Sequence, residues 1–404
     1  MKTLYYHQPH TLLNRALRLL QTIIQRKGIL SLFTTLTILL LPLSVQGQTS
    51  NKILINSGWE MQDAAIISKE GMKAGWEMEN AAKVPQEGQV ISTTKYKPSG
   101  WYKATVPGTV LTTLVNNGVY PEPLYGENNR PEVIPEYLCH TDWWYRNEVM
   151  IPDSYKNKTI WLNFDGINYS ADIWVNGHRV GPIKGAFIRG NFDITPFVKP
   201  GQTAIIAVRI SPQPNTGVPF EHIMGTVGGP CGGVGRLDGP TFGCSSGWDW
   251  LSGIRDRNSG IWQDVFLSAT GHVLMKDPLI TSDLPLPRTD IASVTVQTTV
   301  QNTTGNVQKG IIKGSFDSIK FEKTIEIAPW RSLTFTFDPK DFAQLNIKNP
   351  KLWWPNGLGE QNLYSMHLSF EIDGKVSDEK EVTFGIREVS YDIPGSDNLG
   401  LTVN

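Results

Sequence analysis

Short runs in which apolar and polar residues alternate follow one another through the middle of this chain. A period of two places successive side chains on opposite faces of a strand, so these runs predict strands with one buried face. The predicted strands are residues 143–149, 159–164, 172–175 and 204–210. An Asn-Gly pair at 176–177 follows the third strand and predicts a tight hairpin turn. Several short strands with turns between them favour a jelly-roll-like β-sandwich.

A second group of alternating runs follows from about residue 272. Its strands are predicted at residues 293–300, 310–316, 332–337, 364–370 and 382–389. Their spacing, within a length of roughly 100 residues, is typical of an immunoglobulin-like sandwich. We therefore predict an all-β chain, with a jelly-roll-like domain at residues 48–271 and an immunoglobulin-like domain at residues 272–392.

The composition is that of a globular protein rich in turns. Hydrophobic residues make up 40% and charged residues 19% of the 404 residues, and Gly (38), Pro (26) and Trp (13) are frequent. Helical patterning is scarce: one short helix is predicted at residues 110–117, with Thr109 as its N-cap and Gly118 after its end. The 37 basic and 38 acidic residues give a net charge of −1, which argues against nucleic acid and anionic lipid as partners.

The first 47 residues have the organisation of a secretory signal segment. Basic residues without an acidic one precede an apolar run at residues 29–43, and Val45 and Gly47 are small residues suited to a cleavage site. The run is shorter than the ~20 residues of a membrane-spanning helix. We therefore expect cleavage and export, either secreted or periplasmic, with no membrane association of the mature chain.

Three cysteines are present: Cys139, Cys231 and Cys244. A Cys231–Cys244 disulfide would close a short loop in an exported protein, and buried free thiols are the alternative, so the pairing stays open. Cys139 and His140 lack partners at the spacing of a zinc site. The Gly-rich run at residues 228–235 has no following Lys-Ser/Thr and opens no helix, so it does not predict a phosphate site. We therefore expect no metal and no cofactor.

The segment Trp248-Asp249-Trp250 carries the clearest candidate chemistry. A Gly- and Pro-rich stretch at residues 211–246 leads into it, and loops of this length in compact domains are often functional. A carboxylate between two indoles is costly to bury unless a polar group binds it. Sugars meet this need, because their C–H faces stack on aromatic rings while their hydroxyls donate hydrogen bonds to a carboxylate. The alternative is a core strand in which Asp249 pairs with Arg255 or Arg257.

Other patterns suggest competing chemistry. Residues 243–247 fit the Gly-x-Ser-x-Gly elbow of serine hydrolases, but that motif needs a strand-to-helix turn above a parallel sheet, so we interpret it as a small-residue turn. Asp249, Asp256 and Asp264 suggest an acid pair, yet the arginines that flank Asp256 favour structural ion pairs. Residues 353–355, Trp-Trp-Pro, form either an exposed sugar platform or, in our preferred interpretation, a packed interdomain seam.

Several short segments carry a family resemblance: residues 106–110, 121–126, 143–146, 175–177, 192–195, 246–250, 258–262, 352–357 and 384–387. They occur in the order found in the N-terminal part of glycoside hydrolase family 2, which the chain resembles. The likeness is closest to the β-mannosidase and exo-β-glucosaminidase branch and covers most of the chain from about Trp101 onward. The resemblance implies a sugar-binding jelly roll, an immunoglobulin-like domain and then a (β/α)₈ barrel that carries two catalytic glutamates.

The chain departs from this family pattern at its end. Residues 393–404 correspond to the start of the barrel, and the sequence holds no alternating strand–helix stretch of the ~250 residues that a barrel needs. The resemblance places both catalytic glutamates on the barrel, so no catalytic residue is assigned in this chain. Asp249 matches the jelly-roll aspartate that binds hydroxyls of the terminal sugar, with Trp248 and Trp250 bracing it.

Three hypotheses about function follow, and whether the chain is itself an enzyme stays open among them. The first is the non-catalytic N-terminal part of an exported exo-β-glycosidase of mannoside or glucosaminide type, with its barrel lost or supplied by a separate chain. The second is a stand-alone carbohydrate-binding protein, and the third is a fragment that binds nothing. The expected partner in the first two is a β-linked oligosaccharide or its terminal sugar.

Overall fold

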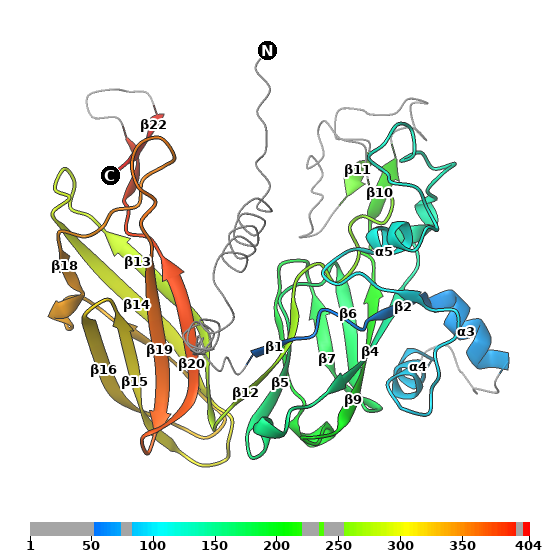
Figure 1. The fold of residues 1–404 in the computed structure, drawn as a ribbon, viewed down its shortest axis with the longest axis horizontal. Coiled ribbons are helices and arrows are strands. Elements are labelled where there is room, and N and C mark those ends of the chain that lie inside the picture. Colours follow the sequence, from blue (N-terminus) through cyan, green and yellow to red (C-terminus); the bar gives the residue numbers. More distant parts are fainter. Residues whose placement is uncertain (1–51, 74–82, 220–233, 238–253, 393–398) are drawn as a thin grey trace, which may run out of the picture. The chain divides into compact units, whose positions relative to one another are not determined.

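The computed structural model describes residues 52–73, 83–219, 234–237, 254–392 and 399–404 (Figure 1). The predicted signal segment lies outside these ranges, as do the predicted sugar-binding residues Trp248, Asp249 and Trp250. Strands dominate the described part and form two sandwiches, which confirms the predicted all-β class. None of its helices is long and apolar enough to cross a membrane.

Two antiparallel sheets form the first sandwich. The six-stranded sheet has the order β3-β2-β4-β9-β6-β7, and the four-stranded sheet has the order β1-β12-β5-β8. Their strands are β1 Lys52–Leu54, β2 Glu60–Asp63, β3 Tyr102–Lys103, β4 Trp143–Met150, β5 Thr159–Phe164, β6 Ser170–Val175, β7 His178–Lys184, β8 Gly190–Asp193, β9 Thr203–Ser211 and β12 Val265–Thr270. The four strands predicted between residues 143 and 210 are confirmed as β4, β5, β6 and β9.

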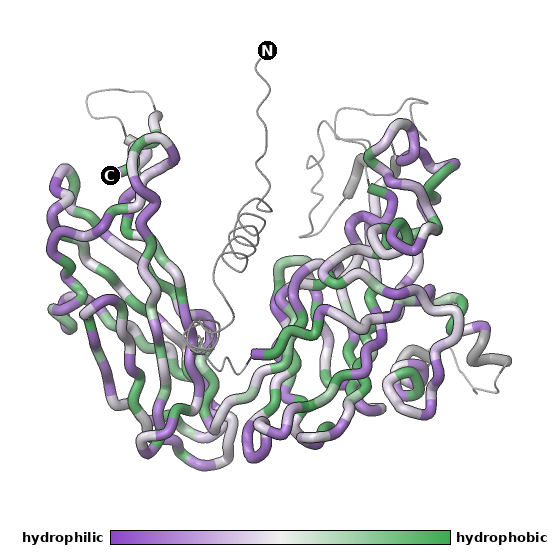
Figure 2. Tube along the Cα trace, viewed as in Figure 1, coloured by the Kyte–Doolittle hydropathy of each residue, from purple (hydrophilic) through white to green (hydrophobic). Residues whose placement is uncertain are grey.

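The inward-facing side chains of these two sheets share one hydrophobic core. Figure 2 shows that hydrophobic and hydrophilic residues alternate along the strands, as expected when one face of each strand is buried. The predicted hairpin joins β6 to β7, and Asn176 and Gly177 both have positive φ angles, 48° and 85°. Two positive φ angles match the twist of the flanking strands, which is why Asn-Gly is favoured at this turn.

Two helices that the sequence analysis did not predict cover part of the outer face of the six-stranded sheet. They are α3 (Ala64–Lys73) and α4 (Lys83–Ile91). Trp144 and Trp174 lie on this face with ring centroids 5.3 Å apart and belong to the same buried cluster as Ile91. A Cβ at Gly88 would lie 2.2 Å from Trp174 Cε2, so only glycine lets α4 approach the sheet this closely. The Gly and Pro residues inside α4 weaken its helical pattern in the sequence.

The predicted short helix is confirmed as α5 (Val110–Asn116). Its N-cap is Thr109, whose side-chain oxygen accepts a hydrogen bond from the Thr112 N–H at 3.2 Å. Gly118 follows the helix end with a φ of 71°. The described residues also form short 3₁₀ helices, which are η2 Glu136–Cys139, η3 Asp153–Tyr155, η4 Thr195–Phe197 and η5 Ala343–Leu345.

The second sandwich also consists of two antiparallel sheets around its own core. One sheet has the order β13-β14-β17, with β18 also paired to β14, and the other has the order β16-β15-β19-β20. The strands are β13 Val273–Asp283, β14 Ile291–Asn302, β15 Gln308–Phe316, β16 Ile319–Ile327, β17 Ser332–Phe337, β18 Asn346–Lys348, β19 Tyr364–Ile372 and β20 Lys375–Phe384. Every second residue of β14 is buried, as the alternation predicts.

One predicted strand of this sandwich is wrong. The pattern at residues 382–389 predicts a single strand, whereas β20 ends at Phe384 and a separate strand, β21, spans Val389–Asp392. Between them the fully buried Ile386 accepts a hydrogen bond from the Trp353 N–H at 2.9 Å, so the backbone here pairs with another loop. β21 pairs with β22 (Leu399–Val403) in a separate two-stranded sheet.

Candidate functional site

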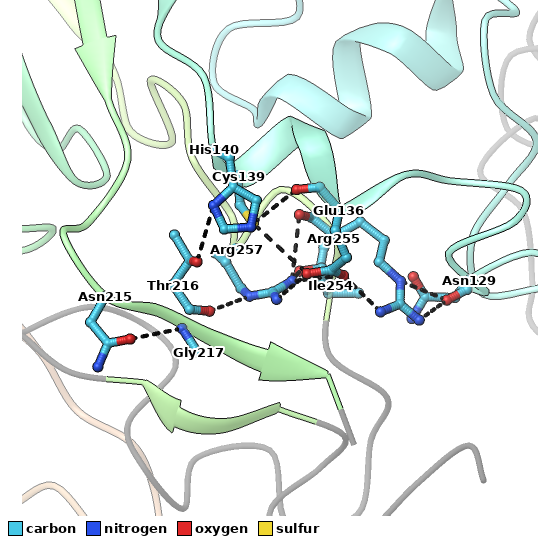
Figure 3. Close-up of polar contacts among 10 residues, drawn as sticks. All are labelled: Asn129, Glu136, Cys139, His140, Asn215, Thr216, Gly217, Ile254, Arg255 and Arg257. Carbon is cyan, nitrogen blue, oxygen red and sulfur yellow. Dashed lines mark hydrogen bonds and ion pairs between the residues drawn. The ribbon is translucent and has the colours of Figure 1, made fainter. Parts of the chain in front are cut away.

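A buried polar network centred on Glu136 lies where three segments of the first sandwich meet (Figure 3). The segments are η2, the first residue of β10 (Thr216–Pro219) and the turn at residues 254–257. β10 pairs with β11 (Val234–Leu237). The turn begins at Ile254, and residues 251–253 separate it from the end of the predicted sugar-binding segment at Trp250.

Glu136 binds two buried guanidinium groups. Arg255 Nη1 lies 2.7 Å from Glu136 Oε1, and Arg257 Nη2 lies 2.5 Å from Glu136 Oε2. The side chains of Arg255 and Arg257 are only 0% and 1% exposed. A buried cation is strongly destabilising without a partner, and the Glu136 carboxylate supplies a negative charge to both arginines.

Backbone carbonyls use the remaining guanidinium donors and connect the three segments. Arg257 Nε donates to Thr216 O at 2.7 Å, and Arg257 Nη1 donates to Ile254 O at 2.8 Å. Arg255 Nε donates to Asn129 O at 2.9 Å. The network therefore fixes the start of β10 against the turn at residues 254–257.

Asp256 has a different role from its neighbours. Its carboxylate is fully buried and accepts hydrogen bonds from the backbone N–H of Leu111 at 2.7 Å and of Asn258 at 2.9 Å. Burial raises the pKa of Asp256, and these backbone donors and the Arg257 charge oppose that rise. The ion pair expected between Asp256 and its flanking arginines is wrong: backbone N–H groups bind Asp256, and the arginines pair with Glu136, a residue that the sequence analysis did not single out. Glu136 lies 121 positions from Arg257, so no local pattern could indicate the pair.

Residues 258–260, with the sequence Asn-Ser-Gly, pack closely against neighbouring backbone. Gly260 has a φ of 153°, and a Cβ there would lie 2.5 Å from Gly108 O. Ser259 O accepts a hydrogen bond from the N–H of Val110 at the start of α5, at 2.8 Å. The Asn168 side chain donates to Asn258 O at 3.0 Å. The turn is thus attached to α5 and to the loop before β6, and only glycine fits at its tightest point.

Glu136, Cys139 and His140 present three potential metal ligands within 4.8 Å of one another. Burial raises the pKa of the Cys139 thiol to about 11, against the opposing charge of Arg257, so the thiol is protonated at neutral pH. Two guanidiniums already bind the Glu136 carboxylate. A protonated thiol and two nearby positive charges disfavour a cation, so this donor set fits an internal hydrogen-bonded network better than a metal site.

Several sequence-based interpretations lie outside the described residues and stay predictions. They are the sugar-binding segment Trp248-Asp249-Trp250 and its alternative ion pair, the runs at residues 228–235 and 243–247, and the pairing of Cys231 with Cys244. Cys139 is a buried free thiol. Trp353 and Trp354 are half-buried, with Arg387 4.8 Å from the Trp353 ring and Gly359 against Trp354, which differs from an exposed sugar platform.

Comparisons with known proteins assign these two sandwiches to one family. The model described as "Glycosyl hydrolase 2 galactose-binding domain-like" matches residues 76–263, and the model described as "Glycosyl hydrolases family 2" matches residues 273–387. An exo-β-D-glucosaminidase of Streptomyces avermitilis is 31% identical over 74% of this chain and 30% of its own length. A mannosylglycoprotein endo-β-mannosidase of Lilium longiflorum is 33% identical over 74% of this chain and 32% of its own length.

A solved structure supports the same assignment. The crystal structure of an exo-chitosanase from Amycolatopsis orientalis superposes with a TM-score of 0.67 and 25% identity, over 88% of this chain and 36% of that one. The chain thus spans about a third of the length of the relatives it matches. The order of the two domain models and the shared fold agree with the expectation from the sequence motifs. The chain belongs to glycoside hydrolase family 2.

Proposed function

We propose that this chain supplies the sugar-recognition part of an exported glycoside hydrolase acting on β-linked mannosides or glucosaminides, with Asp249 accepting hydrogen bonds from hydroxyls of the terminal sugar. Trp248 and Trp250 brace this carboxylate and offer aromatic faces to the ring. The observation that carries the proposal is the match to an exo-β-D-glucosaminidase over 74% of this chain. Charge-assisted hydrogen bonds from a hydroxyl to a carboxylate contribute about 1.5–3 kcal/mol each, enough to orient one sugar.

The Glu136 network supports this proposal physically. Sugar recognition needs its polar groups held in place before the ligand arrives, because ordering a loop on binding weakens affinity. Ile254, five residues after Asp249, begins the turn that Arg255 and Arg257 attach to η2 and β10. The chain that follows the proposed sugar-binding residues is therefore anchored in the interior of the sandwich.

We further propose that this chain does not cleave the glycosidic bond by itself. Retaining hydrolysis needs an acid/base carboxyl and a nucleophilic carboxylate about 5–5.5 Å apart and rigidly held. The two acids of this region have structural partners: Asp256 binds backbone N–H groups, and Glu136 binds two arginines. The relatives extend over about three times the matched length, so the catalytic pair belongs to a part of the enzyme outside these residues.

Calorimetric titration tests the proposal. Chitosan and mannan oligosaccharides are titrated into the wild-type chain, the Asp249→Ala variant and the control Asp283→Ala, which removes an exposed aspartate of the second sandwich. We expect wild type and control to release the same binding heat and Asp249→Ala to lose at least tenfold in affinity, about 1.4 kcal/mol. Equal heats for all three proteins would contradict the binding role. Turnover of an aryl β-mannoside or β-glucosaminide by this chain would contradict the non-catalytic role.

A further inference from the structure

Trp330 differs in exposure from the other tryptophans of the described part of the chain. It lies between β16 and β17, and 68% of its surface is accessible to solvent. The nine other described tryptophans are buried or half-buried. The indole therefore presents a large aromatic face and a polar N–H group to solvent, which is a surface that a ligand with both apolar and polar groups can bind.

The backbone at Trp330 has a conformation that favours glycine. Arg331 N–H donates to Ala328 O at 3.2 Å and closes a four-residue turn, with Pro329 in its second position. Trp330, in the third position, has a φ of 57°. A turn with proline second and a positive φ third normally takes glycine or asparagine there, because a bulky L-residue crowds its own backbone. The indole is thus kept where local backbone preference opposes it, which points to a role of the side chain itself.

A single buried asparagine holds this turn rigidly against the facing turn between β14 and β15. Asn302 is 0% exposed, and its Nδ2 donates to Asn306 O at 2.7 Å and to Ile327 O and Ala328 O at 3.1 Å each. Its Oδ1 accepts from Thr304 N–H at 2.9 Å. Trp330 N–H donates to Thr304 O at 3.1 Å. The two turns therefore form one rigid unit, and the indole is positioned before any ligand arrives.

The immediate surroundings of the indole are small and polar. A Cβ at Gly305 would lie 3.5 Å from Trp330 Nε1, so one side of the ring rests against a residue without a side chain. Asn306, next in the facing turn, is exposed, and its side-chain amide makes no hydrogen bond to any other described residue. A backbone hydrogen bond joins the turn that carries the open ring to the turn that carries the exposed amide. A sugar can bind such a pair of groups, through its C–H face and its hydroxyls.

We propose that Trp330, with Asn306, forms a second glycan-binding site on the immunoglobulin-like sandwich, which binds one pyranose ring of a β-linked oligosaccharide. The site is independent of Asp249, which belongs to the first sandwich. A single open platform of this kind binds with a dissociation constant in the millimolar range. Its contribution grows on a polysaccharide, because binding at one site raises the effective concentration of the chain at the other.

Fluorine NMR on the intact chain labelled with 5-fluorotryptophan tests the proposal. The Trp330 signal is identified by its absence from the Trp330→Phe variant. Titration with a chitosan hexasaccharide and, separately, with a mannan hexasaccharide is expected to move this signal saturably for at least one of them. The same shift is expected in the Asp249→Ala variant, so failure of the first site and failure of this site are distinguishable.

Trp330→Gly separates binding from packing. Glycine suits the positive φ, so this variant is expected to keep or raise the thermal midpoint while losing at least tenfold in retention on immobilised glycan. Tyr391→Ala, which removes another aromatic residue of similar exposure (69%), is the matched control and is expected to retain the wild-type affinity. A Trp330 signal that stays fixed with both glycans, or that moves with protein concentration alone, would overturn the proposal. A lower thermal midpoint for Trp330→Gly would also overturn it, because the indole would then serve packing.

Discussion

Glu136 Oε2 accepts a hydrogen bond from Arg257 Nη2 at 2.5 Å and so joins two residues that lie 121 positions apart. The same carboxylate binds Arg255, and Arg257 reaches Thr216 O at the start of β10. One carboxylate thereby holds η2, β10 and the turn after the proposed sugar-binding segment together. This contact fixes the turn at residues 254–257 to the start of β10 and to η2.

Removing the Glu136 charge is expected to destabilise the fold strongly. In Glu136→Gln two buried guanidiniums lose the charge of the carboxylate that binds them both, and breaking a buried pair in this way costs about 3–5 kcal/mol. The free energy of unfolding in urea measures the loss. Glu127→Gln, which breaks the exposed pair with Arg130, is the control and is expected to change it by less than about 0.5 kcal/mol. Equal small effects of both substitutions would refute the proposed anchor.

A methyl group at Gly260 is expected to disrupt the same region by crowding. A Cβ there would lie 2.5 Å from Gly108 O and 2.7 Å from Thr109 Cα, and backbone atoms cannot move aside cheaply. Gly260→Ala is expected to lower the free energy of unfolding by about 3 kcal/mol or more. Gly374→Ala also has a positive φ but meets nothing within 4 Å, so it should cost only about 1 kcal/mol. Similar losses in the free energy of unfolding for the two variants would show that the backbone around residue 260 shifts to accommodate the methyl group.

The buried carboxyl of Asp256 predicts an unusual dependence of stability on pH. Because burial raises its pKa above the ordinary value of 3.8, the folded chain binds this proton more tightly than the unfolded chain. The stabilisation is complete below the unfolded pKa and is lost as the pH rises through the folded pKa. The free energy of unfolding of wild type relative to Asp256→Asn should therefore fall as the pH is raised from about 4 towards 8.

Asp290 is the control, because its pKa is shifted in the opposite direction and its effect on stability should change with pH in the opposite sense. A hydrogen bond from Arg288 lowers the pKa of the exposed Asp290 carboxyl, so its stabilisation is present above the unfolded pKa and is lost as the pH falls. Stability of wild type relative to Asp290→Asn should rise with pH over the acidic range. For each variant, the difference in free energy of unfolding from wild type is plotted against pH. Slopes of the same sign for Asp256→Asn and Asp290→Asn would show that the Asp256 carboxyl does not cause the predicted loss of stability with rising pH.

Cys139 is expected to be inert in the native protein. Burial raises the pKa of its thiol to about 11, and the thiolate is the reactive form, so a thiol reagent near neutral pH meets almost none of it. In a Cys231→Ser/Cys244→Ser variant, Ellman's reagent should detect no thiol in the folded chain and one thiol after denaturation. Rapid modification of the folded variant would mean that the η2 region opens.

Asn302 is expected to be a structural requirement of the second sandwich. In Asn302→Asp a carboxylate would face the three carbonyls that now accept from Nδ2, at Asn306, Ile327 and Ala328. The loss of these donors in a buried position should lower the free energy of unfolding by about 2–4 kcal/mol. Asn306→Asp, at an exposed position of the same turn, should change it by less than about 0.5 kcal/mol. The opposite ranking would contradict the role assigned to Asn302.

The strands were predictable from the sequence because alternating apolar and polar residues show which face of each strand is buried. β4, β5, β6 and β9 follow from alternation, and α5 follows from a Thr cap and a closing Gly. α3 and α4 were not predictable, since α4 contains Pro and Gly and is stabilised by packing on Trp174 rather than by its own pattern. The break after Phe384 likewise depends on a tertiary hydrogen bond to Ile386.

The candidate site was predictable only in part. Residues 258–262 stood out in the sequence only as a segment that matches the family, and the structure adds the close contact at Gly260. The partner of the arginines was not predictable, because Glu136 carries no local signature and approaches them only through the fold. Trp330 also escaped notice, because neither its exposure nor its positive φ can be read from the residues around it.

A crystal structure of this chain soaked with a chitosan disaccharide tests the central claim most directly. The account predicts hydroxyls of the terminal sugar about 3 Å from the Asp249 carboxylate, with the ring stacked on Trp248 or Trp250. Asp249 locked in an ion pair with Arg255 inside a closed core, with no sugar beside it at saturating disaccharide, would contradict the account.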